Sequence, residues 1–261
     1  MKRKIALFAL VALALTFSGC SGKSTQNTGS TEIYVSAAAS LNGALTEVSR
    51  NYEHEHPGQK VLLNFGGSGA LQQQIEQGAP VDVFIAASST QMDALAAKNL
   101  IDKQTRRDLL TNDLVLITSK SDNQIAGLPD LAKPGVKRIG VGSPDAVPAG
   151  KYAQESLQAL NLWQSLQPKL VLTRDVTQVL SYVETGNAEA GFVYASDAKT
   201  SDKVKVVTVL DPNTHKPITY PAAVVTSGKA NAAAREFLAY LQTPNSSKTF
   251  AAYGFKTLPQ K

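Results

Sequence analysis

The chain has 261 residues, 43% of them hydrophobic, and a formal net charge of +5. Three of its 26 basic residues (Lys2, Arg3 and Lys4) belong to the export signal described below, which leaves 23 basic against 21 acidic residues, a net charge of +2. This balance does not indicate a nucleic-acid binder or a membrane-surface binder, and the length and hydrophobic content suit a compact α/β protein of one large or two smaller domains.

Residues 1–20 have the order of an export signal: a basic start, an apolar run from Ile5 to Phe17, and small residues before Cys20. The apolar run is shorter than the roughly 20 residues that a spanning helix needs. The segment 17–20, FSGC, is similar to the lipobox of bacterial lipoproteins, although Phe17 stands where leucine is usual. In that motif the cysteine is lipidated and becomes the new N-terminus. We therefore expect Cys20, the sole cysteine, to carry a lipid; a buried structural cysteine is the alternative.

Residues 21–31 form the next segment, SGKSTQNTGST, which is polar and small and has no apolar periodicity. This composition is typical of a flexible tether. We therefore expect the globular part of the chain to begin near Glu32.

A strand, a turn of small residues and a helix recur at least four times in the globular part. The strands are predicted at 33–35, 61–65, 139–141 and 170–172. The helix after the fourth strand carries Val176, Val179, Leu180 and Val183 on one face and ends at Gly186. Strands that alternate with helices predict an α/β fold with a mostly parallel sheet, whose ligands gather at the carboxyl ends of the strands.

The turns of these units carry Ser40, Ser68 and Asp175 where a helix N-cap belongs, and otherwise Gly, Ala and Pro, which let a ligand approach the backbone. One such cap is an ordinary structural feature. Several at the same sheet edge are less ordinary, because helix N-termini carry unpaired N–H groups and a partial positive charge. The pattern therefore indicates an anion site that needs no lysine or arginine.

Ser68 also permits a different interpretation. The segment 66–70, GGSGA, nearly matches the G-x-S-x-G turn of hydrolases, with Ala70 in place of the final glycine. Ser68, an aspartate such as Asp197, and His215 would follow the order of α/β-hydrolases. This hypothesis leaves the other small-residue turns unexplained, and His215 lies between two prolines, as a solvated turn residue does. A secreted serine hydrolase that uses Ser68 and His215 is kept as an alternative.

A further strand is predicted at 190–193, and it places Tyr194 at its carboxyl end. By pattern alone we expect Tyr194 to be a core residue with its hydroxyl satisfied at the rim.

Five segments together resemble the extracytoplasmic molybdate-binding proteins that deliver oxyanion to an ABC importer. They are AAASL at 37–41, NFGGSGALQQQIEQGAPVDVFIAAS at 64–88, AVPAGKYA at 146–153, VLSYVETGNAEAGFVYASDA at 179–198 and YPAAVV at 220–225. The resemblance implies no cofactor; the ligand is molybdate or tungstate, held by serine hydroxyls and backbone N–H groups, with a tyrosine completing the shell. The residues implied as contacts of the oxyanion, not of a bare metal cation, are Ser40, Ser68, Ala149, Val176 and Tyr194.

The same resemblance implies a two-lobed, type II-like periplasmic-binding-protein fold with the ligand in the cleft between the lobes. Each lobe is expected to be a mostly parallel sheet flanked by helices. We place lobe 1 in 32–113 plus 219–261 and lobe 2 in 114–218. The resemblance also implies a lipid-anchored monomer outside the cytoplasm without enzymatic activity. Its partners would be a transporter permease and the cytoplasmic ATPase of that permease.

Protonation and size decide which oxyanion such a site takes. Molybdate at neutral pH is a dianion without protons, so it needs donors only. Hydrogenphosphate would leave its proton unpaired, at about 1–3 kcal/mol. Sulfate must be rejected by its shorter bonds, whereas tungstate is nearly isosteric with molybdate. A binding protein for another oxyanion such as sulfate remains an alternative, favoured if Lys151 or Arg174 enters the cleft.

Overall fold

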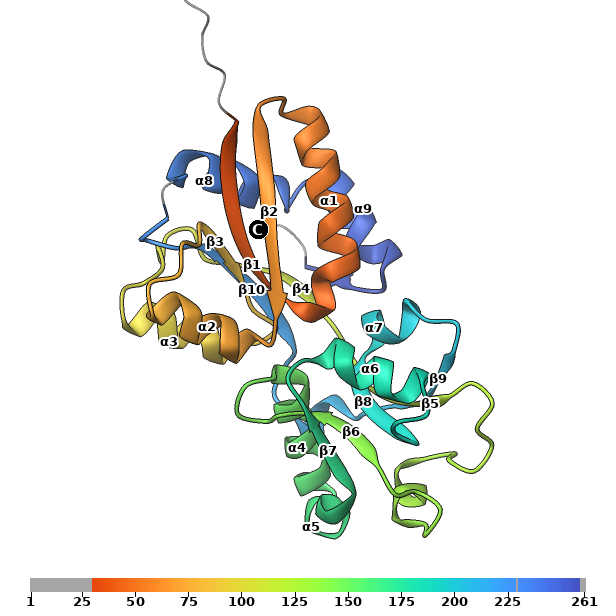
Figure 1. Cartoon of the computed structure of the whole chain (residues 1–261). Helices are drawn as coiled ribbons and strands as arrows, with labels where there is room; N and C mark the ends of the chain where they lie inside the picture. The colour runs from red at the N-terminus through yellow and green to blue at the C-terminus, as the bar shows by residue number, and fades with distance from the viewer. Residues whose placement is uncertain (1–29, 229, 259–261) are drawn as a thin grey trace, which may run out of the picture.

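The computed structural model describes residues 30–228 and 230–258, which form two lobes (Figure 1). The export signal and Cys20 lie outside the described residues. Within that part of the chain, no helix is both long enough and apolar enough to cross a membrane.

Lobe 1 contains a six-stranded sheet with the order β11-β4-β10-β3-β1-β2. Its strands are β1 (Thr31–Ala38), β2 (Gln59–Gly66), β3 (Val83–Ile85), β4 (Arg107–Thr111), β10 (Thr219–Val224) and β11 (Lys256–Thr257). Its helices are the 3₁₀ turn η1 (Ala39–Leu41), α1 (Asn42–Glu55), α2 (Ser68–Glu76), α3 (Ser89–Ala97), α8 (Asn231–Tyr240) and α9 (Pro244–Ala252).

Lobe 2 contains a five-stranded sheet with the order β7-β6-β8-β5-β9. Its strands are β5 (Leu114–Ser119), β6 (Ile139–Gly142), β7 (Leu170–Thr173), β8 (Ala190–Tyr194) and β9 (Val204–Val209). Its helices are α4 (Pro148–Ala159), α5 (Trp163–Leu166), α6 (Val176–Glu184) and α7 (Ala195–Lys199), with the 3₁₀ turns η2 (Leu128–Ala132), η3 (Gln167–Lys169) and η4 (Pro212–Thr214).

The four predicted units of strand, turn and helix are present, at β1–α1, β2–α2, β6–α4 and β7–α6. In α6 the predicted apolar face is buried: Val176, Val179, Leu180 and Val183 are at most 8% exposed. The chain leaves this helix through Gly186, whose φ of +72° is a conformation that glycine adopts without steric cost.

Both sheets are mixed, so the expectation of mostly parallel sheets is wrong. Among the described strands, β1 pairs in parallel with β2 and β3, and β6 pairs in parallel with β7 and β8. The remaining pairs in both sheets are antiparallel. The physical reason is the passage between lobes: β10 and β5 start where the chain enters a lobe, so they run away from the junction while their neighbours run toward it.

The chain passes between the sheets twice, from β4 to β5 through Asn112 and Asp113, and from β9 to β10 through residues 210–218. The carboxyl ends of β1, β2, β6, β7 and β8 consequently meet at the junction of the two lobes.

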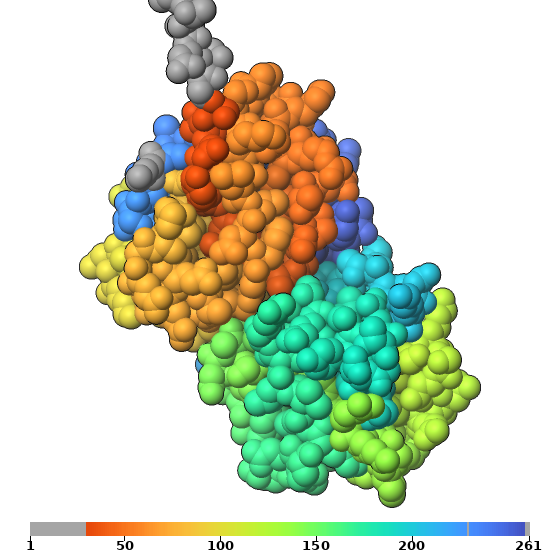
Figure 2. Space-filling model, viewed as in Figure 1, coloured from red at the N-terminus to blue at the C-terminus, as the bar shows by residue number. Residues whose placement is uncertain are grey.

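The two lobes touch through bare backbone at this junction. The Gly69 N–H donates to the Ala146 carbonyl at 2.8 Å. A Cβ added to Gly69 would lie 2.8 Å from Cα of Ala146, and one added to Gly67 would lie 2.6 Å from the Arg174 carbonyl oxygen. Figure 2 shows the two lobes pressed together, with no gap between them on the face in view. The structure is therefore a closed arrangement that larger residues at 67 and 69 would obstruct.

Candidate functional site

A small cavity lies between the lobes, and all five residues implied by the resemblance line it. Ser40 and Ser68 come from lobe 1, whereas Ala149, Val176 and Tyr194 come from lobe 2. The rest of the lining is Ala38, Ala39, Gly66, Gly67, Ala87, Val147 and Pro148. The space open to the centre of a water-sized sphere is ≈ 10 Å³, so the closed cavity suits a small inorganic ion better than an organic solute of ordinary ligand size.

Three helices begin at this cavity. Ser68 is the first residue of α2, Ala149 the second residue of α4, and Val176 the first residue of α6. Backbone N–H groups in the first turn of a helix have no partner within that helix, and the helix dipole places a partial positive charge there. Helices from both lobes therefore offer donors and positive potential to one small volume, as anion sites do.

The expected N-cap is present at Asp175 and wrong at the two serines. The Asp175 carboxylate accepts the Gln178 N–H at 2.8 Å and caps α6. Ser40 lies inside η1, and Ser68 lies inside α2, where Gly67 with extended backbone is the N-cap. The Ser68 Oγ instead accepts the Ala87 N–H at 3.0 Å. This tertiary contact occupies a lone pair of Ser68 and leaves its proton free to be donated.

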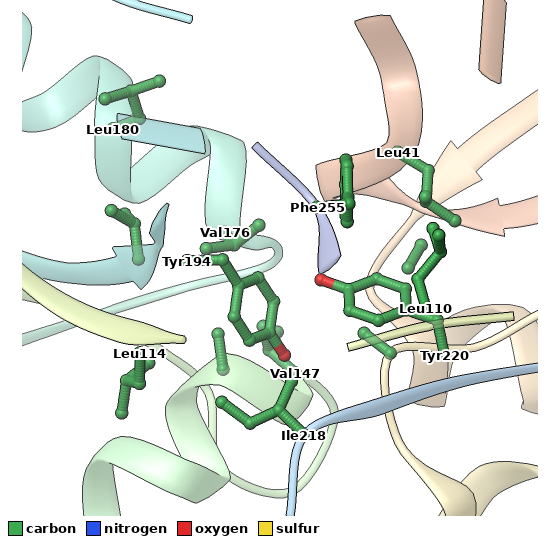
Figure 3. Packing of buried hydrophobic residues seen from close by; sticks show 14 of the residues in the cluster. Leu41, Leu110, Leu114, Val147, Val176, Leu180, Tyr194, Ile218, Tyr220 and Phe255 are labelled. Atoms are coloured by element: carbon green, nitrogen blue, oxygen red, sulfur yellow. The ribbon is translucent and has the colours of Figure 1, made fainter. Parts of the chain in front are cut away.

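Tyr194 ends β8 and is 1% exposed, as expected of a core residue, but the expected partner for its hydroxyl is absent. Among the described residues, that hydroxyl has no hydrogen-bond partner. Burial raises the pKa of Tyr194 well above its ordinary value of 10, so the hydroxyl keeps its proton. A buried unpaired hydroxyl costs about 1–3 kcal/mol. Figure 3 shows Tyr194 beside Val147 and Val176, which line the same cavity, so the spare donor is available to a ligand there.

The lining residues include no lysine or arginine. Lys151 is exposed, and its Nζ donates to Gln154 Oε1 at 3.1 Å. The Arg174 side chain is 85% exposed, with its Nε 3.6 Å from an oxygen of Asp175. Within the part of the chain that the structure describes, no cluster of three or more His, Cys, Asp or Glu residues could hold a metal ion. The donors at the cavity are therefore hydroxyls and backbone N–H groups.

The three residues of the hydrolase alternative do not form a triad in this arrangement. The hydrogen bond of Ser68 is with a backbone N–H, whereas a nucleophilic serine donates to a histidine. His215 is partly exposed, and its Nδ1 lies 2.7 Å from the Lys216 carbonyl oxygen. Asp197 accepts the backbone N–H of Tyr194 at 3.1 Å. The geometry consequently does not support activation of Ser68 as a nucleophile.

Asp197 is the buried acid nearest in sequence to this lining, at 3% exposure. Burial raises its pKa to about 7; the hydrogen bond from Tyr194 N–H opposes the shift, and the charge of Asp175 adds to it. Because Asp197 holds the backbone of Tyr194 at the start of α7, its protonation state acts on the element that presents this tyrosine.

We predict that Asp197 makes the folded chain less stable as the pH rises from about 4 to about 7. Its pKa is higher in the folded than in the unfolded chain, so its contribution is complete below the unfolded value of 3.8 and falls progressively until the buried carboxyl ionises near 7. Asp197→Asn still offers an oxygen to Tyr194 N–H and does not ionise. Its melting temperature relative to wild type should therefore increase between pH 5 and pH 7, in a thermal-denaturation series.

Asp108→Asn, a change at an exposed aspartate, serves as the matched control. A difference in melting temperature between Asp197→Asn and wild type that stays constant over this pH range would contradict the prediction.

Known proteins are similar to this chain over most of its length. The family model described as bacterial extracellular solute-binding protein matches residues 33–256. The molybdate-binding protein ModA of Escherichia coli K12 is 40% identical over 263 residues, covering 98% of this chain and 99% of that protein. YvgL of Bacillus subtilis 168, named as a candidate ABC transporter substrate-binding lipoprotein, is 41% identical over 257 residues, covering 97% of this chain and 98% of that protein. The solved periplasmic molybdate-binding protein of Azotobacter vinelandii superposes with a TM-score of 0.79 at 25% identity, covering 87% of this chain and all of that one.

Proposed function

Because the chain belongs to the bacterial extracellular solute-binding protein family, we propose that it binds molybdate, and also tungstate, outside the cytoplasm and delivers it to an ABC transporter. The observation that carries this proposal is the cavity between the lobes, which offers donors from both lobes and contains no cationic side chain. The relatives named for molybdate binding cover nearly the whole chain, which supports the same ligand class.

The contacts of the ligand would be the hydroxyls of Ser40, Ser68 and Tyr194 and the backbone N–H groups at Ala149 and Val176. A molybdate dianion carries no proton, so each of its oxygens can accept from such donors. Hydrogenphosphate brings a proton that needs an acceptor, and an unpaired proton in the closed cavity costs about 1–3 kcal/mol. Sulfate has no proton, but its shorter bonds keep its oxygens from reaching every donor at once.

The alternatives receive less support. The fold itself does not distinguish molybdate from sulfate, because one scaffold hosts many ligands. The side chains of Lys151 and Arg174 lie outside the cavity lining, so neither cation contributes to binding there. This arrangement favours molybdate, which hydroxyls and backbone N–H groups select in this proposal. The hydrolase alternative needs a histidine that accepts the proton of Ser68, but in the described structure the hydrogen bond of Ser68 is with a backbone N–H. The family to which the chain belongs is one of solute-binding proteins.

Closure of the lobes links binding to delivery in this proposal. An ion that accepts bonds from both lobes stabilises the arrangement in which Gly69 N–H donates to Ala146. A ligand shifts an equilibrium by its differential affinity for the two states. The closed, loaded monomer would then be the form that the permease, with its cytoplasmic ATPase, receives.

Of the predictions made by this proposed function, the first concerns selectivity. A ligand that binds only the folded state adds about 4 kcal/mol of apparent stability at about a thousandfold excess over Kd. Molybdate and tungstate should therefore raise the melting temperature of the purified chain, whereas phosphate and sulfate should change it little. The four anions are compared at matched ionic strength, because a general salt effect acts on all of them.

Ser68→Ala is the matched variant for this measurement. Loss of a charge-assisted hydrogen bond, worth about 1.5–3 kcal/mol, should weaken molybdate binding roughly ten- to a hundredfold. A shift with sulfate as large as that with molybdate would show a general oxyanion binder. An esterase activity that disappears in Ser68→Ala while molybdate binding persists would support the hydrolase.

A second prediction follows from the contact between the lobes. Gly69→Ala places a methyl group against the Ala146 backbone at 2.8 Å, so the lobes cannot close fully. Molybdate affinity should fall tenfold or more by isothermal titration calorimetry, because donors 1 Å out of place lose most of their contribution.

Gly127→Ala is the control, since its Cβ would lie at an ordinary 3.6 Å from Pro129. Unchanged molybdate affinity in Gly69→Ala would show that this close contact is not needed for binding.

The third prediction concerns the anchor. We propose that the chain is held at the outer face of a membrane by a lipid on Cys20, on the basis of the FSGC segment and the lipoprotein name of the Bacillus subtilis relative. Replacing Cys20 by serine should release the protein from the membrane fraction or block its processing. Retention at the membrane with unaltered incorporation of labelled lipid would argue against this anchor.

A further inference from the structure

Tyr220 lies behind Ser40 and does not line the cavity. It is fully buried near the start of β10, where the chain re-enters lobe 1. Its hydroxyl is 3.0 Å from Ser40 Oγ and 3.4 Å from Asn112 Nδ2. Figure 3 shows the Tyr220 oxygen directed toward Tyr194, and the two ring centroids are 5.8 Å apart. Tyr220 therefore lies at the junction of the lobes, and Ser40 separates it from the proposed ligand position.

Asn112 gives this group of hydrogen bonds a direction. Its Oδ1 accepts the Asp113 backbone N–H at 3.0 Å, which identifies the other amide atom as the nitrogen. The Nδ2 group donates to Ser196 Oγ at 2.8 Å and to the Tyr220 hydroxyl. The side chain is buried in the first connection between the lobes, so no solvent competes for these bonds.

The proton of Tyr220 must consequently point away from Asn112. Burial raises the pKa of Tyr220 well above 10, so the phenol keeps its proton, and the charge of Asp197 acts in the same direction. The phenol oxygen already accepts from Asn112, and the acceptor within reach of its proton is Ser40 Oγ at 3.0 Å. With that lone pair occupied, the Ser40 hydroxyl directs its own proton forward into the cavity.

Ser68 is oriented by an equivalent device. Its oxygen accepts the Ala87 N–H, which leaves its proton for the cavity. The donor to the Ser68 oxygen is a backbone N–H, whereas the donor to the Ser40 oxygen is the Tyr220 hydroxyl. In both serines of lobe 1, a donor from behind occupies one lone pair, so the hydroxyl proton is directed toward the cavity.

We infer that Tyr220, held by Asn112, is a positioning residue that fixes Ser40 as a donor and thereby selects against protonated oxyanions. This inference rests on the proposed function and assigns the selectivity of its site to a residue outside the cavity lining. Without the phenol, the Ser40 hydroxyl regains the freedom to rotate and can accept the proton of hydrogenphosphate.

The test is Tyr220→Phe in the full chain, titrated with molybdate and with inorganic phosphate at pH 8, where phosphate is mainly the singly protonated dianion. Molybdate affinity should fall about three- to tenfold. Phosphate affinity, measured by displacement of molybdate, should fall less or rise, so that selectivity for molybdate over phosphate drops about tenfold. Tyr52→Phe is the control: Tyr52 is equally buried and loses a hydroxyl bond of 2.7 Å, but to Gln59, which does not line the cavity as Ser40 does.

A double-mutant cycle with Ser40→Ala separates positioning from a general structural effect. If Tyr220 acts through Ser40, adding Tyr220→Phe to Ser40→Ala should leave both anion affinities nearly unchanged. Equal losses for the two anions, or the same losses in the Ser40→Ala background, would overturn the inference. Wild type that gives no molybdate binding at all would overturn the proposed function instead, and wild-type selectivity in Tyr220→Phe would remove the positioning role while leaving that function intact.

Discussion

The proposed site must hold a doubly charged ion without any opposite charge beside it. Taking an anion out of water costs far more than one hydrogen bond returns, so several donors must converge and none of their dipoles can be turned the wrong way. The cavity meets this requirement with the first turns of α2, α4 and α6 and with hydroxyls whose oxygens are occupied from behind. A neutral donor set also explains selectivity, because a cation would attract sulfate, phosphate and molybdate alike.

The topology of both lobes follows from this convergence. Helix N-termini from two lobes can meet only if the strands before them run toward the junction, as β1, β2, β6 and β7 do. The strands that enter a lobe from the junction, β5 and β10, must then run the other way. The mixed sheets are thus a consequence of crossing twice between lobes. The crossings in turn place Asn112 and Tyr220 directly behind the cavity.

The glycines that follow β2, at the N-cap and in the first turn of α2, serve the contact between lobes. From the sequence, small residues there suggest that a ligand approaches the backbone closely. The structure shows that Gly67 and Gly69 face the backbone of lobe 2 within distances that exclude a side chain. The absence of a Cβ therefore allows the lobes to close over the ion, which places the donors of both lobes around one point.

The sequence alone determined the local units and the candidate contacts. Apolar periodicity located five of the strands and the stripe in α6, and the residue type in the turn located the cap at Asp175, because these depend on residues within a few positions of one another. The resemblance of five segments selected Ser40, Ser68, Ala149, Val176 and Tyr194, which the structure gathers around one cavity. Their roles as ligand contacts stay predictions.

Only the tertiary structure decided how these residues are oriented. Ser68 was expected to cap a helix, yet its hydroxyl pairs with Ala87, and Ser40 pairs with Tyr220, 180 positions away. The lone hydroxyl of Tyr194 and the contact of Gly69 with Ala146 are likewise invisible in local pattern. A hydrogen bond between distant segments leaves no periodicity in the sequence, because its geometry depends on how two sheets pack against each other.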